Sequence, residues 1–235
     1  PFIKFQNSTL SEAYDYVYFR DSIKEYAADY AIELFNLKTG ATLQEKEAIL
    51  KKEPQAFKTY QNVAMQNVCS YVAIPNATKP ELQGYTVAMI DSSLREPNSN
   101  ARYGYEHITG GRIMDTTFSW LEDVLTFTEG GKKVPLAKRQ ETIVSSLHHG
   151  TVPHLSAQEG FMTDFLLYDW EESAVKLTDL GIRFTLTGHV HATDVASYIA
   201  NNGKKLTDIV TGSLISYGSP IRYMNFTRNL VSNGI

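Results

Sequence analysis

Apolar residues recur every three or four positions in the first part of the chain, and this spacing predicts an amphipathic helix over residues 10–36. The residues of the pattern are Phe19, Ile23, Tyr26, Ala27, Tyr30, Ala31 and Leu34. Thr42 and Glu45 have the spacing of a capping box, so a second, charged helix is expected to begin there and to end before Pro54. We therefore expect residues 1–65 to form a helical segment.

From about residue 68 the pattern changes to short apolar runs bounded by Pro, Asn or Gly, which are typical of strands. The runs predict strands at 70–74, 85–90, 143–147 and 182–187, a hairpin from 197–200 and 206–210, and a closing strand at 221–226. A polar loop is expected over 92–113, and helices are expected around 118–125, ending at Gly130 and Gly131, and over 161–179. Strands that alternate with helices indicate an α/β fold with a largely parallel sheet. This portion would cover residues 66–235 of a single domain that spans 1–235.

Composition narrows the functional classes. The chain has 235 residues, a formal net charge of -4 and a pI near 5.9, which argues against the dense basic face that nucleic-acid binding needs. It has no run of about 18 apolar residues, so no membrane span is expected. The single cysteine, Cys69, excludes an intrachain disulfide. Because the chain opens at Pro1, we expect it to be a piece of a longer protein, and the sequence indicates no compartment.

Five of the six histidines fall in a short part of the chain, after two of the expected strands. His148 follows one strand, and the element Gly188-His189-Val190-His191 follows the next. Ligands of parallel sheets bind at the carboxyl ends of the strands, so these imidazoles are expected to converge. Imidazole nitrogens suit zinc, iron and other first-row metals. The sequence therefore predicts His148, His189 and His191 as metal ligands.

The other polar groups leave alternatives open. His149 is either a residue that supports the ligands or a neighbour that points away, and Asp91, at a strand end, is a candidate for the same supporting role. His107 and His154 either contact a substrate or orient a ligand, or they are solvated loop residues. A two-metal centre also needs carboxylates, and the candidates are Asp91, Asp164, Asp169 and Asp194. None of them stands in an Asp-x-His pattern, so the centre is expected to be incomplete in this chain.

The two histidine elements resemble the last two metal motifs of the calcineurin-like metallophosphoesterases, in particular the bacterial members. One element is Leu147-His148-His149, and the other is Gly188-His189-Val190-His191. Further similar segments are Cys69-Ser70-Tyr71-Val72, Val87-Ala88-Met89-Ile90-Asp91-Ser92, Trp120-Leu121-Glu122, Ser213-Leu214 and Arg222-Tyr223. The similarity extends from about residue 69 to residue 226. The aromatic segment 14–35 is similar to the part that follows the family's third metal motif.

The resemblance implies a four-layer α/β/β/α sandwich of mixed sheets with flanking helices, of which this chain is the C-terminal portion. It also implies two divalent metal ions (Mn, Fe or Zn), one bound by His148 and His189 and the other by His191. The family's first three metal motifs, Asp-x-His, Gly-Asp and Gly-Asn-His, do not occur here, so the catalytic histidine stays unassigned. The expected partner is then the missing N-terminal half of the same domain. The implied activity is hydrolysis of small-molecule phosphomonoesters or phosphodiesters by the complete protein.

Two other hypotheses remain open. The shortage of carboxylates favours a non-catalytic module, in which the histidines hold one structural metal ion or none. The aromatic residues of segment 14–35 favour an interaction domain, in which that segment binds a partner independently of metal.

Overall fold

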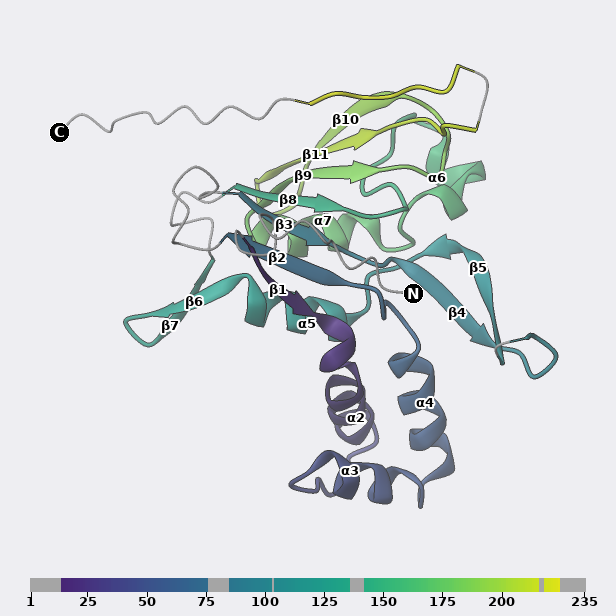
Figure 1. Ribbon diagram of the computed structural model, residues 1–235, viewed down its shortest axis with the longest axis vertical. Coiled ribbons are helices and arrows are strands. Elements are labelled where there is room, and N and C mark those ends of the chain that lie inside the picture. The colour runs from purple at the N-terminus through teal and green to yellow at the C-terminus, as the bar shows by residue number, and fades with distance from the viewer. Residues whose placement is uncertain (1–13, 76–84, 103, 136–141, 216–217, 225–235) are drawn as a thin grey trace.

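The computed structural model describes residues 14–75, 85–102, 104–135, 142–215 and 218–224. Within them the chain has a mixed α/β fold built on a seven-stranded sheet, in the order β1-β2-β3-β8-β9-β11-β10 (Figure 1). The strands are β1 (Tyr14–Tyr18), β2 (Tyr71–Pro75), β3 (Tyr85–Met89), β8 (Thr142–Ser146), β9 (Ile182–Thr187), β10 (Asp194–Ile199) and β11 (Lys205–Val210). The neighbours β3, β8, β9 and β11 are parallel, and the outer pairs are antiparallel.

Six helices and two hairpins accompany the sheet in the described residues. The helices are α2 (Ile23–Leu34), α3 (Leu43–Leu50), α4 (Pro54–Ala64), α5 (Asp115–Val124), α6 (Gln158–Phe161) and α7 (Trp170–Asp179). The hairpins are β4 (Ser93–Pro97) with β5 (Tyr105–Gly111), and β6 (Thr126–Glu129) with β7 (Lys132–Pro135). In Figure 1, α2, α3 and α4 project below the sheet, and the β4–β5 hairpin lies on the side toward which β8 and β9 point. No helix in the described ranges is long and apolar enough to cross a membrane.

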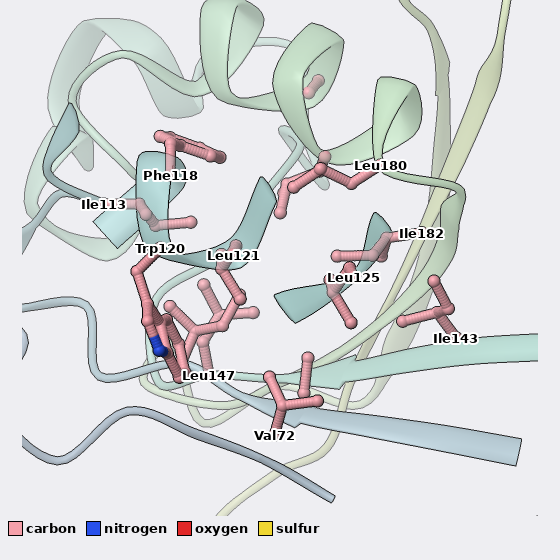
Figure 2. Packing of buried hydrophobic residues seen from close by; sticks show 14 of the residues in the cluster. Val72, Ile113, Phe118, Trp120, Leu121, Leu125, Ile143, Leu147, Leu180 and Ile182 are labelled. Atoms are coloured by element: carbon pink, nitrogen blue, oxygen red, sulfur yellow. The ribbon is translucent and has the colours of Figure 1, made fainter. Parts of the chain in front are cut away.

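One face of the sheet, which we call the covered face, is buried beneath α5 and α7. Its core joins apolar side chains of both helices to inward residues of the strands (Figure 2). The residues labelled there are Val72, Ile113, Phe118, Trp120, Leu121, Leu125, Ile143, Leu147, Leu180 and Ile182. Phe118, Leu121 and Leu125 are buried, whereas Val124 is only partly buried.

The opposite face of the sheet, which we call the open face, is apolar but only partly buried. Successive side chains of a strand point to opposite faces, so each strand contributes alternate residues to it. These residues include Tyr71, Val87, Met89, Leu186 and Ile209, which are all half-buried. On the edge strand β10, Val195 lies in register with Ile209 and is 51% exposed.

Helices α2, α3 and α4 form a helical unit with a core of its own. Its buried residues are Ala27, Ala28, Ala31, Ile32, Leu50, Ala56, Tyr60 and Val63. The expected capping box is present at the start of α3: the Thr42 hydroxyl accepts from the Glu45 backbone N–H, and the Glu45 carboxylate accepts from the Thr42 backbone N–H. Lys46 is buried among the helices and pairs with Asp29 at 2.8 Å.

Several expected elements are wrong in extent or type. The helix over 10–36 begins only at Ile23, because residues Tyr14–Tyr18 form strand β1 and pair with β2; residues 10–13 lie outside the described residues. This aromatic segment packs within the fold, with Phe19 buried against Trp120 at a centroid distance of 5.3 Å. Helix α4 lies within the helical segment expected over 1–65, although it was not predicted as a separate helix.

The loop expected over 92–113 is largely the hairpin β4–β5, whose strands satisfy their backbone groups in an antiparallel ladder. Gly130 and Gly131 do not end a helix; they form the turn between β6 and β7, with φ angles of 57° and 77°. The helix expected over 161–179 is interrupted, since a 3-10 turn (Thr163–Phe165) separates α6 from α7. Residues 221–224 of the expected closing strand are not in a strand, and 225–226 lie outside the described residues.

Candidate metal centre

His148 and His189 come together just beyond the ends of two neighbouring parallel strands, β8 and β9. His148 Nε2 lies 2.7 Å from His189 Nδ1, and the ring centroids are 4.4 Å apart. Because parallel strands end at the same edge of a sheet, the two loops that follow them meet there. The structure thus brings together two of the three imidazoles singled out in the sequence.

The chemistry of this pair fits a shared metal ion. In a tetrahedral site, metal–nitrogen bonds of about 2.0–2.1 Å place two ligand nitrogens about 3.3 Å apart, so the 2.7 Å pair has to open by roughly 0.6 Å to admit an ion. Burial lowers the pKa of both imidazoles, and neighbouring histidines lower it further, so both favour the neutral form that binds metals. His189 Nε2 is also buried, and it has no hydrogen-bond partner in the described part of the chain.

His191 lies nearer the solvent than His189. It is exposed, as is His148, whereas His189 is half-buried; His191 is close enough to contribute to the lowered pKa of His148 and of His189. Among the described residues, no group of three or more His, Cys, Asp or Glu side chains is arranged so that it could hold a metal ion. The part of the site that is assembled is therefore the His148–His189 pair.

The backbone around these ligands turns in an unusual way. His189 and His191 have φ angles of 65° and 55°, in the left-handed region that non-glycine residues seldom occupy. The Val190 N–H donates to the Gly188 carbonyl at 2.8 Å, which closes a three-residue turn centred on His189. The turn therefore lies at His189, one residue after the glycine. Such strained residues persist where the surrounding structure holds them in place, and they cluster at functional sites.

His149 is held on both sides of its ring. Its Nε2 lies 2.9 Å from the Thr109 carbonyl and its Nδ1 lies 2.7 Å from the Ser92 hydroxyl. A carbonyl can only accept, so Nε2 carries the proton and Nδ1 accepts from Ser92. Burial lowers the pKa of His149 to about 4. With both nitrogens engaged, His149 has no atom for a metal, but its ring contacts His148 and His189 at centroid distances of 5.1 and 4.9 Å.

Asp91 follows β3, and its carboxylate turns toward the β4–β5 hairpin. It pairs with Arg95 at 3.2 Å and accepts from the backbone N–H groups of Ser93 and Cys69. Its neighbour Ser92 holds His149, so Asp91 lies beside the residues that support the pair. The other candidate carboxylates also have partners: Asp164 accepts from the Tyr168 hydroxyl, Asp169 pairs with Arg112, and Asp194 pairs with His154.

The two remaining histidines differ from each other. His107 is exposed on β5, as expected for a solvated residue. The side chain of His154 is only 6% exposed, so a solvated loop position is wrong for it; it lies between Asp194 at 2.9 Å and Asp208 at 3.6 Å. Burial lowers the pKa of His154, but the two carboxylates outweigh burial and the net pKa is raised.

Asp208 is a fully buried carboxylate that sequence reasoning missed. The signal was present, because Asp208 stands between Leu206 and Val210 on the inward side of an alternating strand. A charged residue at such a position is rarely buried unless it has partners.

A cavity of about 400 Å³ lies elsewhere, between α5, α7 and the β6–β7 hairpin. No histidine lines it. Two of its lysines are already paired, Lys133 with Asp123 at 2.7 Å and Lys176 with Asp115 at 2.8 Å. The cavity therefore offers no unmatched charge for a ligand, and the histidine pair remains the candidate site.

No model of a known protein family matches the chain. A search of curated proteins also finds no match.

Proposed function

We propose that this chain carries the histidine ligands of a calcineurin-like phosphoester hydrolase of the two-metal type, acting on small phosphomonoesters or phosphodiesters. The observation that carries the proposal is the 2.7 Å approach of His148 Nε2 and His189 Nδ1 at the carboxyl ends of neighbouring parallel strands. In the proposed centre this pair binds one divalent ion and His191 binds the second, with Mn, Fe or Zn as the ions. Paired ions supply charge that binds and polarises a phosphoryl group.

The residues around the pair support this role by orienting it. His149 is neutral and hydrogen-bonded on both sides, so it is a rigid wall for the His148 and His189 rings. Phe165 packs on His189 with ring centroids 4.7 Å apart and shields that imidazole from water. Ligands oriented by their neighbours bind metals more tightly than loose ones, and loss of such neighbours typically weakens binding about 10–100-fold.

The proposal assigns the missing carboxylates to the N-terminal half of the same domain. The carboxylates of Asp91, Asp164, Asp169 and Asp194 are engaged with other groups. The open face supports the same idea, because its apolar residues are only half-buried, and apolar residues gathered on an accessible face are typical of an interface. A second sheet packed there, with its own helices outside, would complete the four-layer α/β/β/α sandwich.

The alternative is a non-catalytic module, in which the histidines hold a single structural metal ion. The engagement of the candidate carboxylates favours it, because three imidazoles carry no negative charge to offset two divalent ions. Metal content separates the two functions. We expect two ions per molecule by elemental analysis once the N-terminal half is included, whereas one ion would favour the structural module.

Activity provides the decisive test. A version that includes the N-terminal half should hydrolyse p-nitrophenyl phosphate or its bis ester with manganese, and His189→Ala should abolish this activity. His107→Ala changes an exposed histidine away from the pair and should leave activity unchanged. If the extended protein is inert with every divalent metal, the hydrolase proposal is wrong.

A further inference from the structure

The carboxylate of Asp208 connects the two segments that carry the histidine pair. Asp208 lies on β11 and is 0% exposed. Its Oδ1 accepts from the Thr187 hydroxyl at 2.6 Å, and its Oδ2 accepts from the Thr151 backbone N–H at 2.6 Å. Thr187 is the last residue of β9, two positions before His189, and Thr151 comes three positions after His148.

A second contact strengthens the same link. The hydroxyl groups of Thr151 and Thr185 lie 2.6 Å apart, so the loop after β8 is also joined to β9 itself. In the sheet, Asp208 lies opposite Thr185, which places the carboxylate beside both threonines of β9. The loop after β8 and the end of β9 are therefore both held to the buried carboxylate of Asp208 on β11.

The partners of Asp208 explain how a carboxylate is tolerated at this depth. Burial of a charge is costly unless it is hydrogen-bonded and paired. Asp208 has two hydrogen-bond donors and His154 Nε2 at 3.6 Å, and His154 is itself held by Asp194 from the solvent side. A buried apolar residue would fill the same space, but it would not accept from Thr151 and Thr187 at once.

We propose that Asp208 is a positioning residue, which sets the separation of His148 and His189 by holding the ends of β8 and β9. Asp208 acts on the pair through its hydrogen bonds with Thr151 and Thr187. The claim that Asp208 sets the separation of the two histidines needs no metal ion. Its consequence for metal binding rests on the proposed function.

The test measures the histidine pair in the metal-free chain. Long-range ¹H–¹⁵N spectra of imidazole nitrogens report which nitrogen carries the proton and whether the His148–His189 hydrogen bond persists. In Asp208→Asn we expect the His148 and His189 signals to shift and the shared hydrogen bond to be lost, while far-UV circular dichroism stays that of a folded protein. Asp194→Asn is the matched control, because it makes the same chemical change at the exposed partner of His154 and should leave the pair as in wild type.

A purely structural Asp208 would give a different result. Asp208→Asn would then unfold at a lower temperature, but its folded form would keep the wild-type His148 and His189 signals, and that outcome would overturn the proposal. If Asp208→Asn does not fold, Thr187→Val replaces it, since valine keeps the shape and removes only the donor to Oδ1. Its control is Thr207→Val, on the opposite side of β11.

Zinc titration of the same proteins separates the two proposals. If the histidine pair binds Zn²⁺, we expect Asp208→Asn to weaken binding about 10–100-fold and Asp194→Asn to have little effect. Equal affinity in wild type and Asp208→Asn would contradict the positioning role. If wild type binds no Zn²⁺, the metal-centre proposal is in question, while the imidazole spectra still decide the role of Asp208.

Discussion

The imidazole of His149 is held on both sides of its ring beside the candidate centre. It is 2% exposed, donates to a carbonyl and accepts from a hydroxyl, and it contacts both rings of the proposed ligand pair. A residue held in this way fixes its neighbours only while it stays neutral. Protonation of Nδ1 would make it a donor that faces the donating Ser92 hydroxyl. The present hydrogen bond would then be lost unless the hydroxyl rotated to accept.

The pH dependence of stability should therefore contain a contribution from His149. Burial lowers its pKa from 6.5 to about 4, so the unfolded chain binds a proton in this range that the folded chain does not. Stability from this group is complete above pH 6.5 and is lost as the pH falls toward 4, by about 3 kcal/mol for a shift of this size. Urea denaturation at about pH 7 and about pH 4.5 should show a steeper loss in wild type than in His149→Gln.

An exposed histidine provides the control for this measurement. His107→Gln should keep the wild-type difference in unfolding free energy between the two pH values, because His107 is exposed on β5. The same difference in wild type and in His149→Gln would contradict the assignment.

For single residues, the sequence predicted positions correctly where they follow from the order of strands along the chain. His148 and His189 follow adjacent parallel strands, so their approach could be predicted. The burial of His154 could not, because it depends on how the loop after β8 folds back onto β11. Asp208 was missed although the alternation along its strand carried the signal. The left-handed backbone of His189 was also unpredictable, since Gly188 beside it is the residue that usually adopts such angles.

At the scale of elements, the sequence predicted the helices and strands that are marked by residues close together in the chain. The capping box of Thr42 and Glu45 marked the start of α3, and the apolar runs marked β3, β8 and β9. The hairpin β4–β5 was missed because its strands carry many polar residues and are stabilised by partners far along the chain. One example is Gln66, whose side chain bonds the backbone of Arg95.

The β4–β5 hairpin in turn presses against the candidate centre, and Gly111 at its end should be essential there. A Cβ at this position would lie 2.2 Å from His149 Nδ1, and the ring cannot withdraw because it is buried and hydrogen-bonded on both sides. We expect Gly111→Ala to lower the free energy of unfolding by about 1–3 kcal/mol. Thermal denaturation measures this loss.

Gly160 offers a matched substitution for comparison. A Cβ on Gly160, in α6, would meet no atom within 4 Å, so Gly160→Ala should leave stability unchanged or slightly raised. Equal effects of alanine at the two glycines would show that the hairpin does not confine His149.

At the scale of the whole molecule, the two faces of the sheet should respond differently to the same substitution. Val72 is fully buried on the covered face, and Val87 is half-buried on the open face. Val72→Thr places a hydroxyl in an apolar core and should cost about 1–3 kcal/mol of unfolding free energy. Val87→Thr should cost less than about 1 kcal/mol, because water reaches the open face. Chemical denaturation of both variants compares them; losses of equal size would mean that the open face is covered in solution.

The helical unit has its own buried core, and this separation has a consequence for how the molecule loses its structure. The helical unit meets the rest of the fold at the start of α2, where Ile23 belongs to the core of the covered face and the Tyr26 hydroxyl donates to Asp123 of α5 at 2.7 Å. Native-state amide hydrogen exchange should therefore find two cooperative blocks, with the amides of the helical unit opening before those of β3, β8 and β9. A single opening free energy for both would contradict this. Local unfolding of the helical unit would then leave the ends of β8 and β9 folded, and the imidazoles beyond them would keep their positions.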